Sequence, residues 1–295
     1  MDFRLTEDQK ALRAGVRELL ARRFDREALR AAVDAGGALD RALWRELGAA
    51  GFFALRLPEE AGGVGLGLPE AVLLFEEAGR ALLPGPLIAT HLAAGEVPGA
   101  ADGSVVVTAV DGALVEWLDA ADVVLGEAGG AVPVRSVDPL TPLHRVASAA
   151  GAAVPAPTAR EASVADLLTA AEQLGSAAAT TDMAVAYAKD RTQFGQAIGG
   201  FQAVKHLCAG MLVRTELARA AVYAAAVTGD PVEIAGARLL ADEAAVRGAR
   251  DCLQVHGGMG FTWEADVHLH LKRAWVRAER GLSGAAAEEA VAAAL

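Results

Sequence analysis

Asp190-Arg-Thr-Gln-Phe-Gly-Gln-Ala-Ile-Gly-Gly-Phe-Gln202 is the stretch on which the interpretation of this sequence depends. It combines a fixed cation, amide side chains, two aromatic rings and three glycines between two long segments of helical pattern. Arginine offers a forked donor to phosphate, an aromatic ring can stack on a base, and glycine lets backbone N–H groups approach a ligand closely. The residues alone leave two interpretations open, a loop that grips a dinucleotide and an ordinary connection between helices.

Helical patterns lie on both sides of this stretch and continue to the C-terminus. Ser163 is the expected N-cap of the preceding helix, and Asp230-Pro231 supplies a cap and a first-turn proline further on. Gly257-Gly258 should end the helix that Pro231 begins. We therefore predict a four-helix bundle with helices at 163–190, 201–228, 231–256 and 265–280, the last extended by an alanine-rich tail.

A second glycine-rich segment, Gln254-Val-His-Gly-Gly-Met-Gly-Phe261, follows the third of these helices. It has the same kinds of residue as the first loop, an amide, an aromatic ring and several glycines. Two such loops in one bundle could hold the two ends of a single extended cofactor.

The segment from Trp263 to Lys272 supports a competing hypothesis, because apolar and polar residues alternate strictly along it. A strand would place two carboxylates and two imidazoles on one face, which is a plausible metal site. In a helix, His268 and His270 would diverge and the pattern would lose its meaning. The metal-binding alternative uses Glu264, Asp266, His268 and His270.

The first hundred residues also have helical patterns. Thr6 and Gln9 form a capping box. The segment from Leu57 to Gly67 contains too much glycine for either a helix or a strand, so we expect a loop. Further helices are expected from Asp40, from Pro69 to Arg80 and from Leu87 to Ala94.

Short β-branched runs separated by Gly, Asp and Ala turns begin at Ser104 and indicate a small β insert. Pro133 restricts the fourth run to a sheet edge or a bulge. The stretch 149–162 is expected to be a linker. The fold class is therefore mainly α, with a helical domain at 1–100, a β domain at 101–156 and a helical bundle at 157–295.

Composition and missing motifs exclude several classes of function. The 295 residues have a formal net charge of −11 and a pI near 5.1, which disfavours a nucleic-acid partner. No signal peptide or long apolar segment is present, so we expect a cytoplasmic protein without membrane contact. The usual motifs of nicotinamide binding, nucleotide hydrolysis, zinc proteolysis and serine hydrolysis are absent. Cys208 and Cys252 are expected to be buried small hydrophobes.

The two glycine loops together resemble the paired C-terminal signature of the FAD-dependent acyl-CoA dehydrogenases. Three earlier segments are similar to the N-terminal helical domain of that family: Leu43-Trp-Arg-Glu-Leu47, Pro58-Glu-Glu with Gly62-Gly63, and Glu76-Glu-Ala-Gly-Arg80. The resemblance implies a helical domain, a β domain and a four-helix bundle in that order. It also implies a flavoprotein oxidoreductase of lipid or steroid catabolism that removes hydrogen from the α and β carbons of an acyl-CoA thioester.

In that family the flavin ring lies between the β domain and the bundle of one subunit, while the ADP half of FAD reaches the neighbouring subunit. The resemblance assigns this ADP-side role to Arg191, Gln193, Phe194, Gln254, Gly257 and Gly258.

The reaction also needs a glutamate that takes the α-proton as hydride leaves the β-carbon. The two positions at which the family carries this glutamate correspond here to Ala165 and Gly281, and neither has a carboxyl group. Asp166 is the neighbouring candidate, but one residue along a helix turns a side chain by about 100°. As the fourth residue from Ser163 it could equally cap the helix.

The region between Ala101 and Ala156 is also shorter than the β domain of that family. Both departures are explained by a shortened subunit of a hetero-oligomeric acyl-CoA dehydrogenase, similar to the paired short and long subunits of actinobacterial steroid degradation. A full-length partner would then carry the base. The alternative is a self-sufficient homo-oligomer that uses Asp166 or Glu264 as its base.

Overall fold

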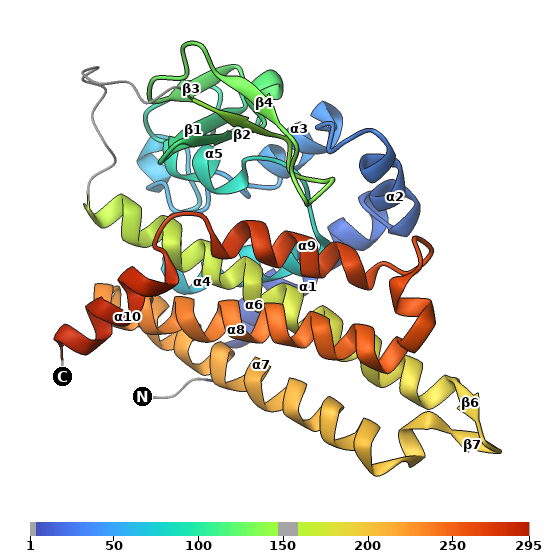
Figure 1. The fold of residues 1–295 in the computed structure, drawn as a ribbon. Coiled ribbons are helices and arrows are strands. Elements are labelled where there is room, and N and C mark those ends of the chain that lie inside the picture. Colours follow the sequence, from blue (N-terminus) through green and yellow to red (C-terminus); the bar gives the residue numbers. More distant parts are fainter. Residues whose placement is uncertain (1–3, 147–158, 295) are drawn as a thin grey trace. The chain divides into compact units, whose positions relative to one another are not determined.

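The computed structural model describes residues 4–146 and 159–294 and is mainly helical, as predicted (Figure 1). The chain divides into two compact units. We call them the N-terminal unit, with residues 5–74, 83–146 and 159–168, and the C-terminal unit, with residues 75–82 and 169–294. No helix in the described part of the chain is long and apolar enough to cross a membrane.

Five helices precede the sheet, α1 (Glu7–Arg23), α2 (Arg26–Asp34), α3 (Arg41–Ala49), α4 (Leu68–Ala81) and α5 (Leu87–Ala93). The predicted caps are confirmed: Thr6 and Gln9 form the capping box, and the Asp40 carboxylate accepts from the first N–H groups of α3. The glycine-rich segment after Leu57 is a loop with one short 3₁₀ turn at Glu59–Ala61. Helix α2, which Asp25 caps, was not anticipated.

The β insert forms a five-stranded sheet in the order β3-β1-β2-β5-β4. Its strands are β1 (Val107–Asp111), β2 (Leu114–Glu116), β3 (Val123–Leu125), β4 (Val132–Val134) and β5 (Leu143–Arg145). Only β1 and β3 are parallel. Pro133 lies in β4 at the sheet edge, as predicted, whereas β5 was missed. Thr90 joins α5 to the sheet by accepting from the N–H of Val107 and donating to its carbonyl.

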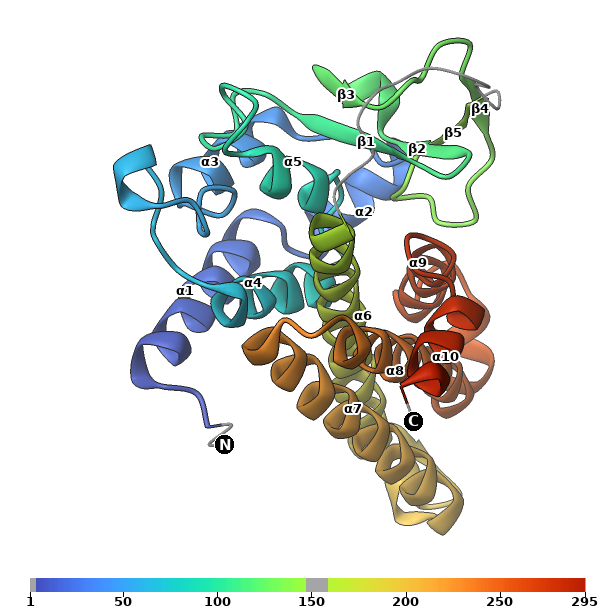
Figure 2. The ribbon, with the colours of Figure 1, turned by 90° about the vertical axis from the view of Figure 1, so that its left-hand side faces the viewer.

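The C-terminal helices are α6 (Ala159–Asp190), α7 (Gln202–Thr228), α8 (Pro231–His256), α9 (Val267–Ala278) and α10 (Gly284–Ala293). Helix α8 packs on α7, α9 and α10, and α7 lies alongside it in Figures 1 and 2. Two predictions were wrong. Helix α6 begins four residues before Ser163, and the C-terminal tail is a separate helix because Gly281 has φ 63° and Ser283 caps a new start. The part of the predicted linker from 149 to 158 lies outside the described residues, and the remainder belongs to α6.

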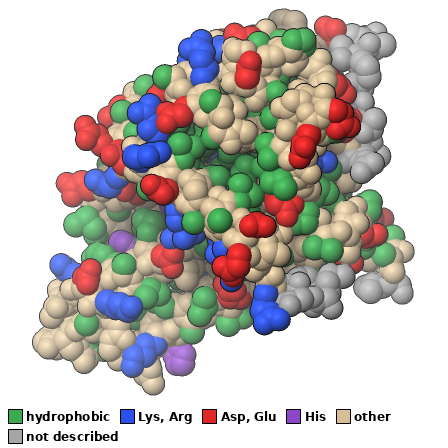
Figure 3. All heavy atoms as spheres, turned by 180° about the vertical axis from the view of Figure 1, so that it is seen from behind, with side chains coloured by type: hydrophobic (Ala, Val, Ile, Leu, Met, Phe, Trp, Pro, Cys, Tyr) green, Lys and Arg blue, Asp and Glu red, His purple; other side chains and the backbone are tan. Residues whose placement is uncertain are grey.

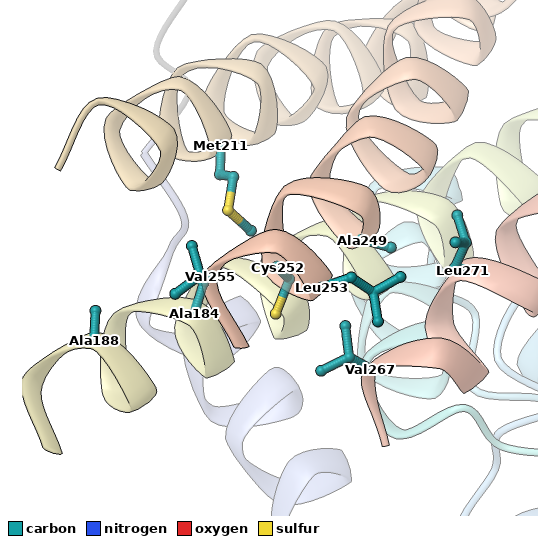
Figure 4. Close-up of a cluster of buried hydrophobic side chains, with 9 residues drawn as sticks. All are labelled: Ala184, Ala188, Met211, Ala249, Cys252, Leu253, Val255, Val267 and Leu271. Atoms are coloured by element: carbon teal, nitrogen blue, oxygen red, sulfur yellow. The ribbon is translucent and has the colours of Figure 1, made fainter. Parts of the chain in front are cut away.

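Small and medium apolar side chains fill the core between the C-terminal helices. Figure 4 shows nine of them, contributed by α6, α7, α8 and α9. Cys252 lies buried among them, as predicted, while Cys208 is only partly buried beside them. Gly79 and Gly175 let residues 75–82 of α4 lie directly on α6, because a Cβ at either glycine would collide with backbone of the other helix.

Charged side chains of both signs are interspersed on the face drawn in Figure 3. No extended patch of one charge covers that face.

Candidate functional site

The two glycine loops that the sequence singles out lie at the same end of the C-terminal unit. Tyr187, one turn before Arg191, stacks on His256 with ring centroids 4.1 Å apart and planes at 20°. Ala188 and Val255 belong to the same apolar cluster. Because these contacts join the last turns of α6 and α8, the segments that follow the two helices start side by side.

The first loop is a β-hairpin at the tip where α6 ends and α7 begins (Figure 1). Strands β6 (Thr192–Gln193) and β7 (Gln196–Ala197) are joined by the two residues Phe194 and Gly195, with φ of 53° and 79°. Positive φ at both positions is the signature of a type I′ turn. A non-glycine residue rarely adopts it, so Phe194 is held in an unfavourable backbone conformation with its ring 92% exposed.

Arg191 has a fixed backbone and an available side chain. Its N–H donates to the carbonyl of Tyr187 at 2.9 Å, and its own carbonyl accepts from the N–H of Ile198 at 2.8 Å. The guanidinium is exposed, and Arg191 forms no ion pair with any carboxylate in the described part of the chain. The hairpin therefore presents an anchored cation that no intramolecular anion occupies.

The second loop starts where α8 ends at His256 and continues as a 3₁₀ turn, Gly257–Phe261. Gly257 has φ 58° and ψ −138°, a conformation that only glycine adopts readily. Gly258 has no positive φ, and a Cβ added there would meet nothing within 4 Å. At Gly260, in contrast, an added Cβ would lie 2.9 Å from the carbonyl oxygen of Leu253. Internal packing thus requires Gly260 but not Gly258.

Large apolar side chains are exposed around this end of the unit. Besides Phe194, the ring of Phe261 is 77% exposed, and Met259 and Trp263 are also exposed. The ammonium of Lys272 lies 4.6 Å from the centre of the Trp263 ring. Rings, amides and an unpaired arginine suit a ligand that has both a flat base and anionic phosphates.

The positions considered for a catalytic base lie away from these loops along the sequence. Ala165 and Asp166 are in α6, and Gly281 is in the turn between α9 and α10. Asp166 is 8% exposed, and because α6 begins at Ala159 it lies inside the helix. Its expected role as a capping residue next to Ser163 is therefore wrong.

The strand between Trp263 and Lys272, on which the metal hypothesis depends, is also wrong. Helix α9 begins at Val267, so His268 and His270 lie two positions apart on a helix and point about 200° apart. His270 faces inward, where its Nδ1 lies 2.9 Å from the hydroxyl of Ser176. Within residues 4–146 and 159–294, no group of three His, Cys, Asp or Glu side chains could hold a metal ion.

A buried arginine that the sequence analysis did not single out joins α8 to the end of α9. Arg238 is fully buried and donates to the Asp242 carboxylate at 2.9 Å, to the carbonyl of Arg280 at 2.8 Å and to the carbonyl of Arg277. It fixes the backbone just before Gly281. Burial raises the pKa of Asp242 above its usual value, and the Arg238 guanidinium opposes only part of that rise. In the sequence, this ion pair could have been recognised from an Arg and an Asp four residues apart on an otherwise apolar helix face.

Another buried polar network ties residues 75–82 to α7. The carboxylate of Glu76 accepts from the Tyr223 hydroxyl at 2.7 Å and pairs with Arg219. Burial, together with the Glu76 charge, raises the pKa of Tyr223 to about 12. These groups satisfy one another within the C-terminal unit, so we assign them a structural role.

Two family models match the chain. One, "Acyl-CoA dehydrogenase, N-terminal domain", covers residues 6–104, and the other, "Acyl-CoA dehydrogenase, C-terminal domain", covers residues 160–287. Both glycine loops and the helices that carry them lie within the second match.

Three similar proteins are informative. Acyl-CoA dehydrogenase IpdE2 of Mycobacterium tuberculosis is 38% identical over 293 residues, and the match covers 91% of each chain. Acyl-CoA dehydrogenase FadE34 of the same organism is 36% identical over 79% of this chain but only 39% of its own. The fold matches a chain of the ChsE4-ChsE5 complex from Mycobacterium tuberculosis with a TM-score of 0.85 and 23% identity, covering 99% of this chain and 98% of the other.

Proposed function

This chain belongs to the acyl-CoA dehydrogenase family of FAD-dependent oxidoreductases, and from that premise we propose that it is the short subunit of a hetero-oligomeric enzyme. It would hold the ADP half of FAD, and a full-length acyl-CoA dehydrogenase subunit would contribute the catalytic carboxylate. One observation carries the proposal. The ADP-side loops are complete, whereas neither Ala165 nor Gly281 has a carboxyl group.

The residues of the two loops fit the ADP half of the cofactor. An exposed guanidinium without an intramolecular partner, Arg191, suits the diphosphate, and the exposed ring of Phe194 suits the base. Gln193 and Gln254 offer amide donors and acceptors. The empty space over Gly258 suits the close approach of a ligand to the backbone. Cofactor binding explains why this position lacks a side chain that internal packing would tolerate.

The missing carboxylate limits what this chain does in the reaction. Bound FAD supplies the acceptor for the hydride that leaves the β-carbon of the acyl-CoA. The α-proton must pass to a positioned base at the same time. The methyl group of Ala165 and the hydrogen of Gly281 can accept no proton. This chain's residues therefore bind and orient, and proton transfer belongs to the partner.

The comparisons support a paired arrangement. IpdE2 has nearly the same extent as this chain. The region of FadE34 that is similar to this chain makes up 39% of FadE34, so there a segment of this kind is joined to much further polypeptide. ChsE4-ChsE5 is a complex of two differently named chains. The proposed substrate is an acyl-CoA thioester of lipid or steroid catabolism, turned over in the cytoplasm.

The proposal is tested by co-expressing the chain with a full-length acyl-CoA dehydrogenase subunit and measuring flavin absorbance per assembled complex. We expect the complex to retain FAD and the Arg191→Ala complex to bind it roughly tenfold to a hundredfold more weakly, the usual effect of losing a charge-assisted contact of about 1.5–3 kcal/mol. Arg247→Ala is the matched control, because Arg247 is an exposed α8 arginine paired with Glu243. Unchanged flavin affinity in Arg191→Ala would contradict the assignment.

A self-sufficient homo-oligomer is the second candidate. One observation favours it, namely that Asp166 is a buried carboxylate directly next to the family's base position. On this hypothesis the isolated chain would bind FAD and oxidise acyl-CoA, and Asp166→Asn would abolish turnover.

A further inference from the structure

Tyr187 and His256 form the aromatic contact between the ends of α6 and α8, and each ring is itself held in place. Tyr187 is half-buried and packs against the apolar cluster drawn in Figure 4. The Nδ1–H group of His256 donates to the carbonyl of Cys252 at 2.8 Å. A carbonyl oxygen only accepts, so this contact places a ring proton on Nδ1 and sets the orientation of the imidazole. The stack therefore joins two rings whose positions are fixed.

Each ring is directly connected to one of the two glycine loops. The carbonyl of Tyr187 accepts from the N–H of Arg191 at 2.9 Å, so the residue that stacks also holds the backbone of the arginine. His256 is the last residue of α8, and a Cβ added at Gly260 would lie 3.0 Å from the Cβ of His256. The second loop thus folds back against His256. Through the stack, the backbone at Arg191 is linked to the second loop.

The residues of both loops that would meet a ligand lie at the surface. Residues 189–196 are all exposed, and so are Gln254 and residues 257–259. Exposed loops with little buried apolar surface are the parts of a protein that move most readily. A ligand that spans two moving loops must order them when it binds, and this ordering reduces its affinity. A fixed contact at the base of both loops removes part of that loss.

We propose that Tyr187 and His256 are positioning residues for the cofactor. Their stack sets the spacing between Arg191 and the second glycine loop, so that both reach the ADP half of one FAD. Neither residue is among the six that the family resemblance assigns to this half. The inference rests on the proposed function, because it concerns the same FAD site. The pair increases affinity without touching the cofactor, by holding the two loops in place before FAD binds.

The test compares substitutions that keep or remove the stack, in the complex with the full-length subunit. The flavin is removed, FAD is added back, and its dissociation constant is measured from flavin absorbance. We expect His256→Leu, which fills the space without a flat ring, to raise this constant by roughly threefold to tenfold, the usual effect of losing an aromatic pair. His256→Phe keeps a ring on Tyr187 and should stay within about twofold of the wild type. An equal loss in both variants, or no loss in His256→Leu, would overturn the proposal.

Val246→Ala is the control for a purely structural effect. Val246 lies further back along α8 and packs on the same apolar cluster as Tyr187. The substitution should lower the free energy of unfolding, measured with denaturant, without changing the dissociation constant of FAD. If Val246→Ala weakens FAD binding as much as His256→Leu does, the stack acts only through general stability and the proposal is wrong.

A double-mutant cycle tests whether the stack acts through Arg191, and it separates this inference from the proposed function. The effect of His256→Leu should be much smaller in the Arg191→Ala complex, because no guanidinium is left to position. Equal effects of His256→Leu in both backgrounds would contradict the positioning role. If Arg191→Ala alone leaves FAD affinity unchanged, the proposed function fails and this inference fails with it. If Arg191→Ala weakens FAD binding while His256→Leu does not, only this inference is wrong.

Discussion

Gly257, Gly258 and Gly260 stand close together in one loop but lack side chains for different reasons. Gly257 needs a backbone conformation that other residues avoid, and Gly260 lies against the carbonyl of Leu253. Neither reason applies to Gly258. A glycine that neither its backbone conformation nor internal packing requires is a useful indicator of a binding site. At such a position a side chain would collide only with a ligand or another chain.

Gly258→Ala is therefore expected to leave the free energy of unfolding within about 0.5 kcal/mol of wild type while reducing flavin retention in the assembled protein. Denaturant unfolding and flavin absorbance measure the two effects separately. Gly260→Ala is the matched comparison and should destabilise the fold, because its Cβ would be forced against backbone. Full flavin retention in Gly258→Ala would mean that the cofactor does not approach this backbone.

The features of the candidate site that were predicted correctly are local ones, such as the helix end at Gly257. The hairpin turn at Phe194-Gly195 was not predicted, because a phenylalanine rarely adopts positive φ. The contact that brings the loops together, the stack of Tyr187 on His256, joins residues far apart in the sequence. The sequence around Tyr187 or His256 contains no pattern that predicts this contact.

At the scale of elements, helices with a cap or a proline at the start were predicted well. Asp40 and Asp230-Pro231 mark the starts of α3 and α8 correctly. Helix α6 was predicted too short, because alanine favours helix strongly enough to continue beyond the Ser163 signal. Strand β5 was missed because its three residues, Leu143–Arg145, include no β-branched or aromatic apolar side chain, whereas the equally short β2, β3 and β4 all contain valine. The predicted helix at 265–280 is confirmed by α9, so the alternation of apolar and polar residues up to Lys272 does not mark a strand.

Arg238 links helix α8 to the end of helix α9, and its removal should destabilise the C-terminal unit strongly. Arg238→Ala removes the cation that pairs with the largely buried Asp242 carboxylate, to which Gln173 still donates, and it takes a donor from two carbonyls at the end of α9. Removing one partner of a buried ion pair typically costs about 3–5 kcal/mol. Arg247→Ala is again the comparison, because it removes an exposed pair on the same helix worth less than about 1 kcal/mol. Similar unfolding free energies for the two variants would contradict this role.

Helix α5 gives the N-terminal unit a predictable response to acid. Burial lowers the pKa of His91 from 6.5 to about 4, and the contact with the Phe52 carbonyl opposes only part of that shift. Between these two values the unfolded chain binds a proton that the folded chain does not, so stability falls as the pH decreases. The accumulated loss is about 3 kcal/mol once the pH is below 4.

His91→Gln keeps a side-chain donor but cannot titrate. The free energy of unfolding of this variant, measured from pH 7.5 to pH 4.5, should depend less steeply on pH than that of the wild type. Parallel curves for the two proteins would show that another group causes the acid sensitivity.

At the scale of the whole molecule, the family membership that the two glycine loops indicated is confirmed. The division of the site between two chains is our proposal, and it depends on the loops that resemble the ADP-side half of a dehydrogenase site. The role of the other half could be inferred only from what is missing at Ala165 and Gly281. No pattern in one chain specifies the surface or the carboxylate of a partner, because those are properties of a different sequence.

The most direct test of this account is the rate of acyl-CoA oxidation by the chain purified alone, saturated with FAD, compared with its complex with the full-length partner. We expect turnover only in the complex, because loss of a positioned base typically lowers a rate by about 10²–10⁴. Asp166→Asn should leave the complex nearly unchanged, while replacing the partner's glutamate should abolish activity. Turnover by the isolated chain that disappears in a correctly folded Asp166→Asn variant would contradict the account and identify a self-sufficient enzyme.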